Sequence, residues 1–285
     1  MINDYRMPKT VEDAMVALQE GNAKIIAGGT DLMIDLKAGK LNSEMLVDVT
    51  QIEGIKKIEQ KGEYLVLGAG TTHQEITESE LIQKNAKVLA KACSTVGSLQ
   101  VRNTATLAGN VVNAQPAADG AVALVALGAE AKIVDTAGES YELIENLYEG
   151  LTKSKVDSTS QMVTEIRFPA LKDGQGSAYT RWAKREALAL PMLCIAVTLS
   201  VKKDEVEWIR IAMAPVATKP VRAMEAEAIL TGQQPTEEVI QKAADKAVEE
   251  SNPRDSLVRG SREVRVAVLP NLVKRAIREA LENAK

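Results

Sequence analysis

The order of apolar and polar residues predicts two structural units before residue 169. The first reads as a β-α-β unit, in which Thr10 can cap a helix that ends before Gly21. Its expected segments are a helix, a strand, a helical turn and a strand, over residues 11–20, 24–27, 31–37 and 45–49. The second unit is expected to hold a hairpin, a helix and two further strands, over residues 55–59 with 64–68, 81–93, 129–134 and 162–168.

The pattern changes after residue 168 and predicts a domain boundary. Residues 169–176 combine a proline, a charged turn and two glycines, which are typical of a link. Beyond it, three apolar strands precede three helices, over residues 178–182, 194–201, 206–215, 221–230, 237–250 and 261–282. Strands followed by helices favour a small α+β domain, here with a three-stranded sheet. The predicted domains are 1–172, with subdomains of about 1–55 and 56–172, and 177–285.

Composition narrows the possible classes of function. The 285 residues carry a net charge of −4 with basic residues spread along the chain, so no electrostatic footprint for nucleic acid or an anionic membrane is present. No segment approaches the roughly 20 apolar residues that would allow membrane insertion. Residues 1–6 lack the apolar core of a signal peptide, so a cytoplasmic protein is expected. Cys93 and Cys194 have the wrong spacing for a metal site and are expected to be buried thiols.

Two short glycine segments carry the strongest functional signal. The first is Ala27-Gly28-Gly29-Thr30-Asp31-Leu32, directly after Ile25-Ile26; the second is Thr106-Leu107-Ala108-Gly109-Asn110, which leads to Asp119. The first alone is also typical of a tight strand-to-helix turn. Glycine lets backbone N–H groups approach an anion, and neighbouring hydroxyl and amide groups can donate to it. The pair therefore predicts a pyrophosphate site, where the Asp119 carboxylate suits a ribose hydroxyl or an adenine amino group.

Other candidate residues have weaker support. His73 is the only histidine, and no nucleophile elbow or further metal ligand accompanies it, so a structural or ligand-lining role is expected. Gly68-Ala69-Gly70 opens like a dinucleotide fingerprint, but His73 stands at its third glycine position. Arg102 could neutralise charge near the second glycine segment, or it could brace the loop.

These residues make the chain resemble the FAD-binding medium subunit of the molybdenum hydroxylases over its whole length. That family includes bacterial xanthine, nicotinate and carbon monoxide dehydrogenases. The matching positions are residues 25–32, 97–103 and 106–110, then Asp119, Tyr179, Arg181 and Arg185, and finally 259–265. The sequence departs from the family at Ala108, where glycine is usual, and at Arg181, where lysine is common. A methyl group at residue 108 requires a negative φ or some strain.

The resemblance implies a fold and a binding site. The fold would be α+β, with a two-part FAD-binding domain of the vanillyl-alcohol-oxidase/PCMH type and a CO dehydrogenase flavoprotein-like C-terminal domain. Residues 25–32 and 106–110 would clamp the pyrophosphate of FAD. Gly97, Asp119, Val163 and Arg181 would line the rest of the cofactor.

The resemblance also implies an electron-transfer function. FAD would receive electrons from a [2Fe–2S] iron-sulfur subunit and pass them to NAD or another acceptor, while a molybdopterin-binding large subunit carries the substrate chemistry. Residues 259–265 look most like the xanthine dehydrogenase type, so a purine is the first expected substrate of the complex. Nicotinate- or CO-dehydrogenase types and a flavin-free assembly subunit are the alternatives. A solitary flavin oxidase is disfavoured by the short chain and the lack of a residue placed for covalent flavin attachment.

Overall fold

A small parallel sheet opens the chain. The computed structural model describes residues 2–285, and its first elements are β1 (Asp4–Arg6), α1 (Val11–Gln19), β2 (Ala23–Ile26), α2 (Leu32–Lys37), β3 (Met45–Asp48) and the 3₁₀ turn η1 (Val49–Gln51). Both β1 and β2 pair in parallel with β3, which lies between them. Thr10 caps α1, as the sequence predicts, because its hydroxyl accepts the Asp13 N–H at 3.0 Å. The additional strand β1 is too short to show a period in the sequence.

The next unit is built on an antiparallel sheet of five strands. They are β4 (Ile58–Lys61), β5 (Tyr64–Gly68), β6 (Glu130–Asp135), β7 (Gly138–Leu143) and β10 (Met162–Pro169). Strand β10 inserts between the β4–β5 and β6–β7 hairpins, which lie far apart in the sequence. The turn η2 (Ile144–Asn146) and the short pair β8 (Tyr148–Gly150) and β9 (Lys153–Ser154) connect β7 to β10.

Short helices fill the long connection from β5 to β6. They are α3 (His73–Glu78), α4 (Glu80–Asn85), α5 (Lys87–Ser94), α6 (Leu99–Arg102), α7 (Leu107–Val112) and α8 (Asp119–Leu127). The prediction of a single helix over 81–93 was wrong, because the chain leaves the helical conformation at Ala86 and forms α4 and α5 instead. Helix α8 was not expected: all nine of its residues are buried, so no polar face marks the helical period.

The C-terminal unit is a sheet covered by helices. Its elements are β11 (Gln175–Trp182), β12 (Leu193–Lys202), β13 (Glu205–Ala214), β14 (Val221–Arg222), α9 (Met224–Leu230), α10 (Glu237–Glu249) and α11 (Arg262–Asn283). The expected three-stranded sheet has a fourth, two-residue strand, because β14 pairs with β13. The helix expected over 221–230 therefore begins only at Met224.

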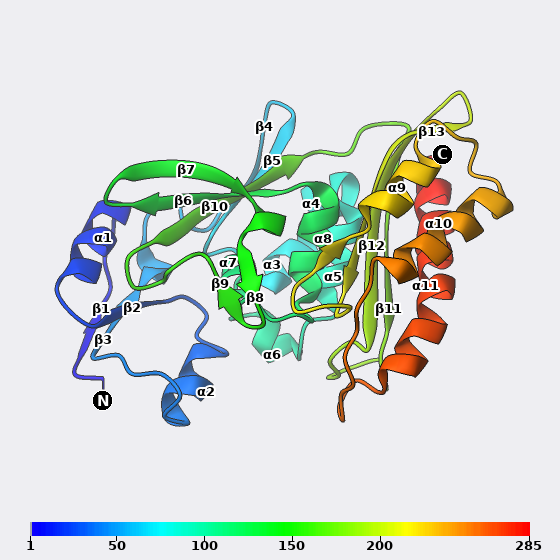
Figure 1. Ribbon diagram of the computed structural model, residues 1–285. Helices are drawn as coiled ribbons and strands as arrows, with labels where there is room; N and C mark the ends of the chain where they lie inside the picture. The colour runs from blue at the N-terminus through cyan, green and yellow to red at the C-terminus, as the bar shows by residue number, and fades with distance from the viewer. Residues whose placement is uncertain (1) are drawn as a thin grey trace.

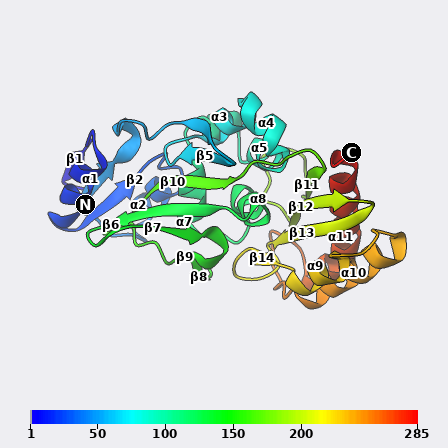
Figure 2. The ribbon, with the colours of Figure 1, turned by 90° about the horizontal axis from the view of Figure 1, so that it is seen from above.

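Helix α8 joins the two units. It lies between the five-stranded sheet and the C-terminal sheet (Figure 1), while α9, α10 and α11 cover the other face of the C-terminal sheet (Figure 2). On β12 the side chains alternate accordingly: Leu193 and Ile195 pack in the core with the terminal helices, and Cys194 packs in the core around α8. The Thr198 hydroxyl donates to the Ala126 carbonyl at 2.6 Å, which satisfies one of the carbonyls at the C-terminal end of α8.

Two further expectations from the sequence concern the cysteines and membrane-spanning helices. Cys93 and Cys194 are both buried free thiols, as expected. Among residues 2–285, no helix combines the length and apolar character that crossing a membrane requires.

Candidate functional site

The first glycine segment packs directly against the chain that precedes the second. A Cβ atom at Gly28 would lie 2.2 Å from the Thr104 carbonyl oxygen and 2.8 Å from the Ala105 Cα. Only glycine permits this approach of two backbones. Gly29 has a φ of +65°, in the left-handed region that also favours glycine. On the other side, the Ile25 N–H donates to the Ser158 carbonyl at 2.9 Å. The two glycine segments are therefore neighbours in space.

The second glycine segment begins a helix, whereas the sequence had suggested a loop. Thr106 is the N-cap of α7, and its hydroxyl accepts the Gly109 N–H at 3.0 Å. Ala108 is a buried residue of the first helical turn with no positive φ, so the methyl group causes no strain there. Gly109 is exposed, and a Cβ atom on it would meet only the Thr106 Oγ1, at 2.9 Å.

The chain that leaves β5 holds the second segment in place. Thr72 and Thr106 form an antiparallel bridge. The His73 N–H donates to the Ala105 carbonyl at 3.0 Å, and the Leu107 N–H donates to the Thr71 carbonyl at 3.1 Å. Three chain segments from different parts of the sequence therefore meet at Gly28, Ala105 and Thr72.

Asn110 connects the second glycine segment to α8. Its Oδ1 accepts the Ala121 N–H at 3.2 Å. Because that oxygen is occupied, the Nδ2 amide group is the part of Asn110 that can donate to a ligand. Asn110 also packs closely against Gly120, the residue after Asp119 at the start of α8, where a Cβ atom would lie 3.0 Å from the Asn110 Oδ1.

Asp119 is a buried acceptor for side chains from two other elements. Its Oδ1 accepts from the Tyr179 hydroxyl, from Arg181 Nε at 3.0 Å and from the Thr95 hydroxyl at 3.2 Å. The side chains of Asp119 and Arg181 are 8% and 10% exposed. Burial raises the pKa of Asp119, and the hydrogen bonds from Tyr179 and Arg181 oppose that rise. The sequence named Tyr179 only as part of the family pattern and gave no signal for Thr95.

Arg181 also fixes the exposed loop that follows β11. Its guanidinium donates to the Ala189 carbonyl, while Arg185 donates through Nε to the Ala187 carbonyl at 3.0 Å. The two arginines therefore shape the segment between β11 and β12 beside Asp119.

The remaining candidate residues lie on β10 and in the turn before α6. Val163 is buried in β10 at a β-bulge, and the carbonyl of the following Thr164 accepts the Ala69 N–H at 3.0 Å. Gly97 has a φ of +49° in the turn before α6. Arg102 braces that turn, because it donates to the Val96 carbonyl at 3.2 Å and to Gln74 Oε1 at 3.0 Å. Of its two possible roles, the structure shows the bracing one.

His73 is fully buried behind the second glycine segment. Both of its ring nitrogens lack a hydrogen-bond partner among the described residues. Burial, with a smaller contribution from the Arg102 charge, lowers the pKa of His73 to about 4, so the ring is neutral at pH 7.

Two family models identify the class of protein that this fold and site define. Residues 1–171 match the FAD binding domain in molybdopterin dehydrogenase, and residues 178–280 match the CO dehydrogenase flavoprotein C-terminal domain. The chain belongs to the family of FAD-binding medium subunits of the molybdenum hydroxylases. It is accordingly an oxidoreductase subunit whose cofactor is FAD.

The relatives match the chain along almost its whole length. The carbon monoxide dehydrogenase medium chain of Hydrogenophaga pseudoflava is 29% identical over 279 residues, covering 97% of this chain and 96% of the relative. The xanthine dehydrogenase FAD-binding subunit of Escherichia coli O157:H7 is 26% identical over 284 residues, covering 98% and 96%. A solved carbon monoxide dehydrogenase from Hydrogenophaga pseudoflava superposes with a TM-score of 0.94 at 29% identity, covering 100% and 99% of the two chains.

The observed residues fit FAD. Gly109 is exposed and leaves main chain accessible where a bulky side chain would cover it. The Asn110 amide and the Asp119 carboxylate offer a donor and an acceptor nearby. Accessible main chain and an amide donor beside a single buried acceptor match the chemistry of a dinucleotide, which carries both a pyrophosphate and hydroxyl groups.

Proposed function

We propose that this chain binds FAD at its two glycine segments and relays electrons between a [2Fe–2S] partner subunit and an acceptor such as NAD. Residues 25–32 and 106–110 hold the pyrophosphate, and Gly97, Asp119, Val163 and Arg181 surround the rest of the cofactor. The observation that carries the proposal is the contact of Gly28 with the backbone of Thr104 and Ala105, which places the two segments side by side.

Gly109 and Asn110 form the phosphate-facing part of the proposed site. Gly109 is exposed and carries no side chain, so a phosphate oxygen can come close to the main chain. The Asn110 Nδ2 amide can donate to the same oxygen, because its Oδ1 is held by the Ala121 N–H. These two residues bind and orient the anion.

Asp119 and Arg181 form an ion pair with little net charge, which we place beside the part of FAD that follows the pyrophosphate. All three donors that reach the Asp119 carboxylate use Oδ1. The second oxygen, Oδ2, therefore stays available to accept from a ribose hydroxyl or an adenine amino group. Tyr179 and Thr95 hold this carboxylate in position, so little side-chain entropy is lost when a ligand donates to it.

FAD supplies the electron chemistry when it is bound, and the chain supplies position and electrostatic environment. No acid or base is required of the candidate residues. His73, the one side chain whose ordinary pKa is near neutrality, is buried and uncharged.

Gly109→Ala separates ligand contact from folding. In a helix, alanine is favoured over glycine by about 1 kcal/mol, which offsets the close approach of the new Cβ to the Thr106 Oγ1, so α7 should stay folded in the variant. The added methyl group would occupy the proposed phosphate position and should weaken FAD binding about tenfold or more. Flavin absorbance and fluorescence titration measure the affinity, and thermal unfolding measures stability. Gly150→Ala is the matched control, because nothing lies within 4 Å of a Cβ there.

Three outcomes would contradict the FAD proposal. Wild-type affinity in Gly109→Ala would place the phosphate elsewhere. Flavin that stays with acid-precipitated protein would contradict non-covalent binding. A colourless protein, both as the purified chain and in a co-expressed complex, would favour the assembly-subunit alternative.

The partners and substrate are proposed from the family. Co-expression with an iron–sulfur subunit and a molybdopterin-binding large subunit should give a stable complex that reduces NAD⁺ or a dye. We place a purine first as its substrate, because residues 259–265 resemble the xanthine dehydrogenase type, and nicotinate-like rings and carbon monoxide after it. Turnover of each substrate by the complex tests this order. Equal turnover by the isolated chain without molybdenum would replace the relay with a solitary oxidase.

A further inference from the structure

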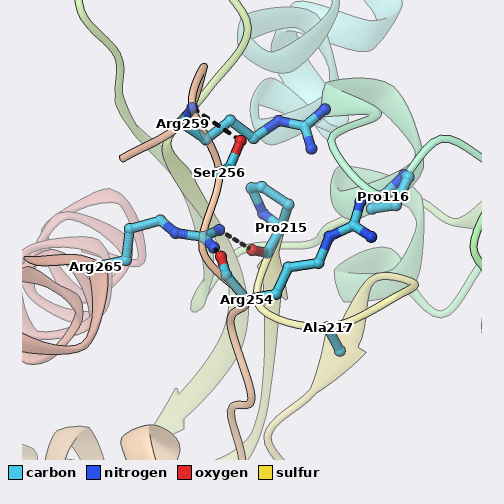
Figure 3. Close-up of a pocket in the computed structure, with 7 residues that line it drawn as sticks. All are labelled: Pro116, Pro215, Ala217, Arg254, Ser256, Arg259 and Arg265. Carbon is cyan, nitrogen blue, oxygen red and sulfur yellow. Dashed lines mark hydrogen bonds between the residues drawn. The ribbon is translucent and has the colours of Figure 1, made fainter. Parts of the chain in front are cut away.

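Three arginines meet in a small pocket outside the glycine segments. Arg254, Arg259 and Arg265 line it together with Ser256, and Pro116, Pro215 and Ala217 complete its wall. Figure 3 shows the guanidinium groups of Arg254 and Arg259 extending toward Pro116, while Arg265 approaches Pro215. Pro116 comes from the link between α7 and α8, Pro215 follows β13, and the arginines precede or begin α11.

The segment that carries the arginines is held in a defined shape. Ser256 and Gly260 form an antiparallel bridge, and the Arg259 N–H donates to the Ser256 hydroxyl at 3.1 Å. Arg265 is only 2% exposed and donates to the Pro215 carbonyl at 2.7 Å and to the Arg254 carbonyl. The Arg265 guanidinium is thus oriented by the fold before any ligand arrives.

Most of the guanidinium donors in this pocket have no protein partner among the described residues, although Arg254 is exposed to solvent. A guanidinium carries five N–H donors. Only two donors of Arg265 are satisfied by the contacts above, and the Nε atoms of Arg259 and Arg265 are buried without a partner among residues 2–285. Within the same described part of the chain, none of the ion pairs includes Arg254, Arg259 or Arg265.

The three charges also repel one another. Burial lowers the pKa of Arg259 and of Arg265, and the neighbouring arginines lower each further. Like charges brought together in a partly buried place cost free energy unless an anion joins them. The Asp255 charge partly offsets this repulsion at Arg265, but no carboxylate lines the pocket.

We propose that Arg254, Arg259 and Arg265 form a binding site for a phosphate group of a small molecule. Guanidinium groups match the oxygens of a phosphate through paired N–H donors. A phosphate dianion balances more of the three positive charges than a single carboxylate does, which favours phosphate over an acidic side chain. None of the residues that line this pocket belongs to either glycine segment, where the FAD pyrophosphate is proposed to bind.

Calorimetric titration of the FAD-loaded full chain with inorganic phosphate and with pyrophosphate tests the site. Loading with FAD occupies the glycine segments, and low ionic strength keeps the charges unscreened. We expect the wild type to bind, and we expect Arg254→Gln and Arg259→Gln each to lower the phosphate affinity by at least about tenfold. Arg275→Gln, an exposed arginine of α11 outside the pocket, is the matched control and should bind like the wild type.

A thermal-unfolding series separates ligand binding from a purely structural role. Phosphate should raise the Tm of the wild type and of Arg275→Gln but not of Arg259→Gln. Without phosphate, Arg259→Gln should keep or raise the Tm, because one repelling charge is gone. Equal phosphate binding by all variants, no binding by the wild type, or a stronger response to acetate than to phosphate would each overturn the proposal. If the protein bound no FAD, the same titration on the colourless chain would still report on the arginines.

Discussion

Gly28→Ala tests whether the contact between the two glycine segments is needed for cofactor binding. The new Cβ would lie 2.2 Å from the Thr104 carbonyl oxygen, whereas an ordinary contact is 3.4–4 Å. The backbones would have to separate by about 1 Å. The neighbouring atoms are main chain, so no flexible side chain can move aside.

The separation has a cost in stability and a second cost in affinity. Overpacking of this kind typically lowers the free energy of unfolding by about 1–3 kcal/mol. A shift of the phosphate-facing main chain should remove at least one hydrogen bond to a charged oxygen, worth about 1.5–3 kcal/mol, or about ten- to a hundredfold in FAD affinity.

Urea unfolding and flavin fluorescence titration measure the two quantities on the same samples. Gly150→Ala should change neither, because a Cβ there meets nothing within 4 Å. If Gly28→Ala lost stability but bound FAD like the wild type, the contact would be a packing feature and the first segment would not hold the pyrophosphate. If it lost neither, the approach of the two backbones would be less close than described.

Two further predictions concern buried ionisable groups. Asp119→Ala should lower the free energy of unfolding by about 3–5 kcal/mol in urea, because Arg181 and Tyr179 lose a buried acceptor; a loss below 1 kcal/mol would show that the pair is solvated. His73 takes up a proton near its ordinary pKa of 6.5 in the unfolded chain, but only near 4 in the folded chain. The free energy of unfolding should therefore fall as the pH decreases from 6.5 to about 4, and His73 should account for about 3 kcal/mol of that fall. His73→Phe should remove that part of the pH dependence, and equal pH slopes in the two proteins would contradict the buried, neutral ring.

Amphipathic helices and apolar strands could be predicted from the sequence, including the wholly buried β3, whereas the wholly buried helix α8 and the very short strands could not. Helix α10 alternates buried and exposed residues with a helical period, and Thr236 marks its start. Helix α8 offers no such contrast, β1 and β14 have three and two residues, and the break at Ala86 depends on packing. Local patterns therefore identified the amphipathic helices and the longer strands of the chain.

Residue type revealed the candidate site, but its contacts could not be read from the sequence. Gly28 and Gly109 were informative because glycine is chosen where a side chain cannot fit or would obstruct. The neighbour of Gly28, Thr104, and the partners of Asp119, Thr95 and Tyr179, are set by the way distant segments pack. The same limit explains why the second glycine segment was expected as a loop, since the Thr106 cap becomes evident only with the backbone in place.

The position of α8 has a consequence for the construction of chimeric flavoproteins. The link between β10 and β11 looks like the natural place to cut when the last third of one such subunit is exchanged for that of another. Helix α8 precedes this cut. The carbonyls at its C-terminal end, however, accept hydrogen bonds from Thr198 and Arg210, which both follow the cut. A graft made there would set α8 against a foreign sheet. Successful recombinants should therefore inherit α8 and β11–β13 from the same parent.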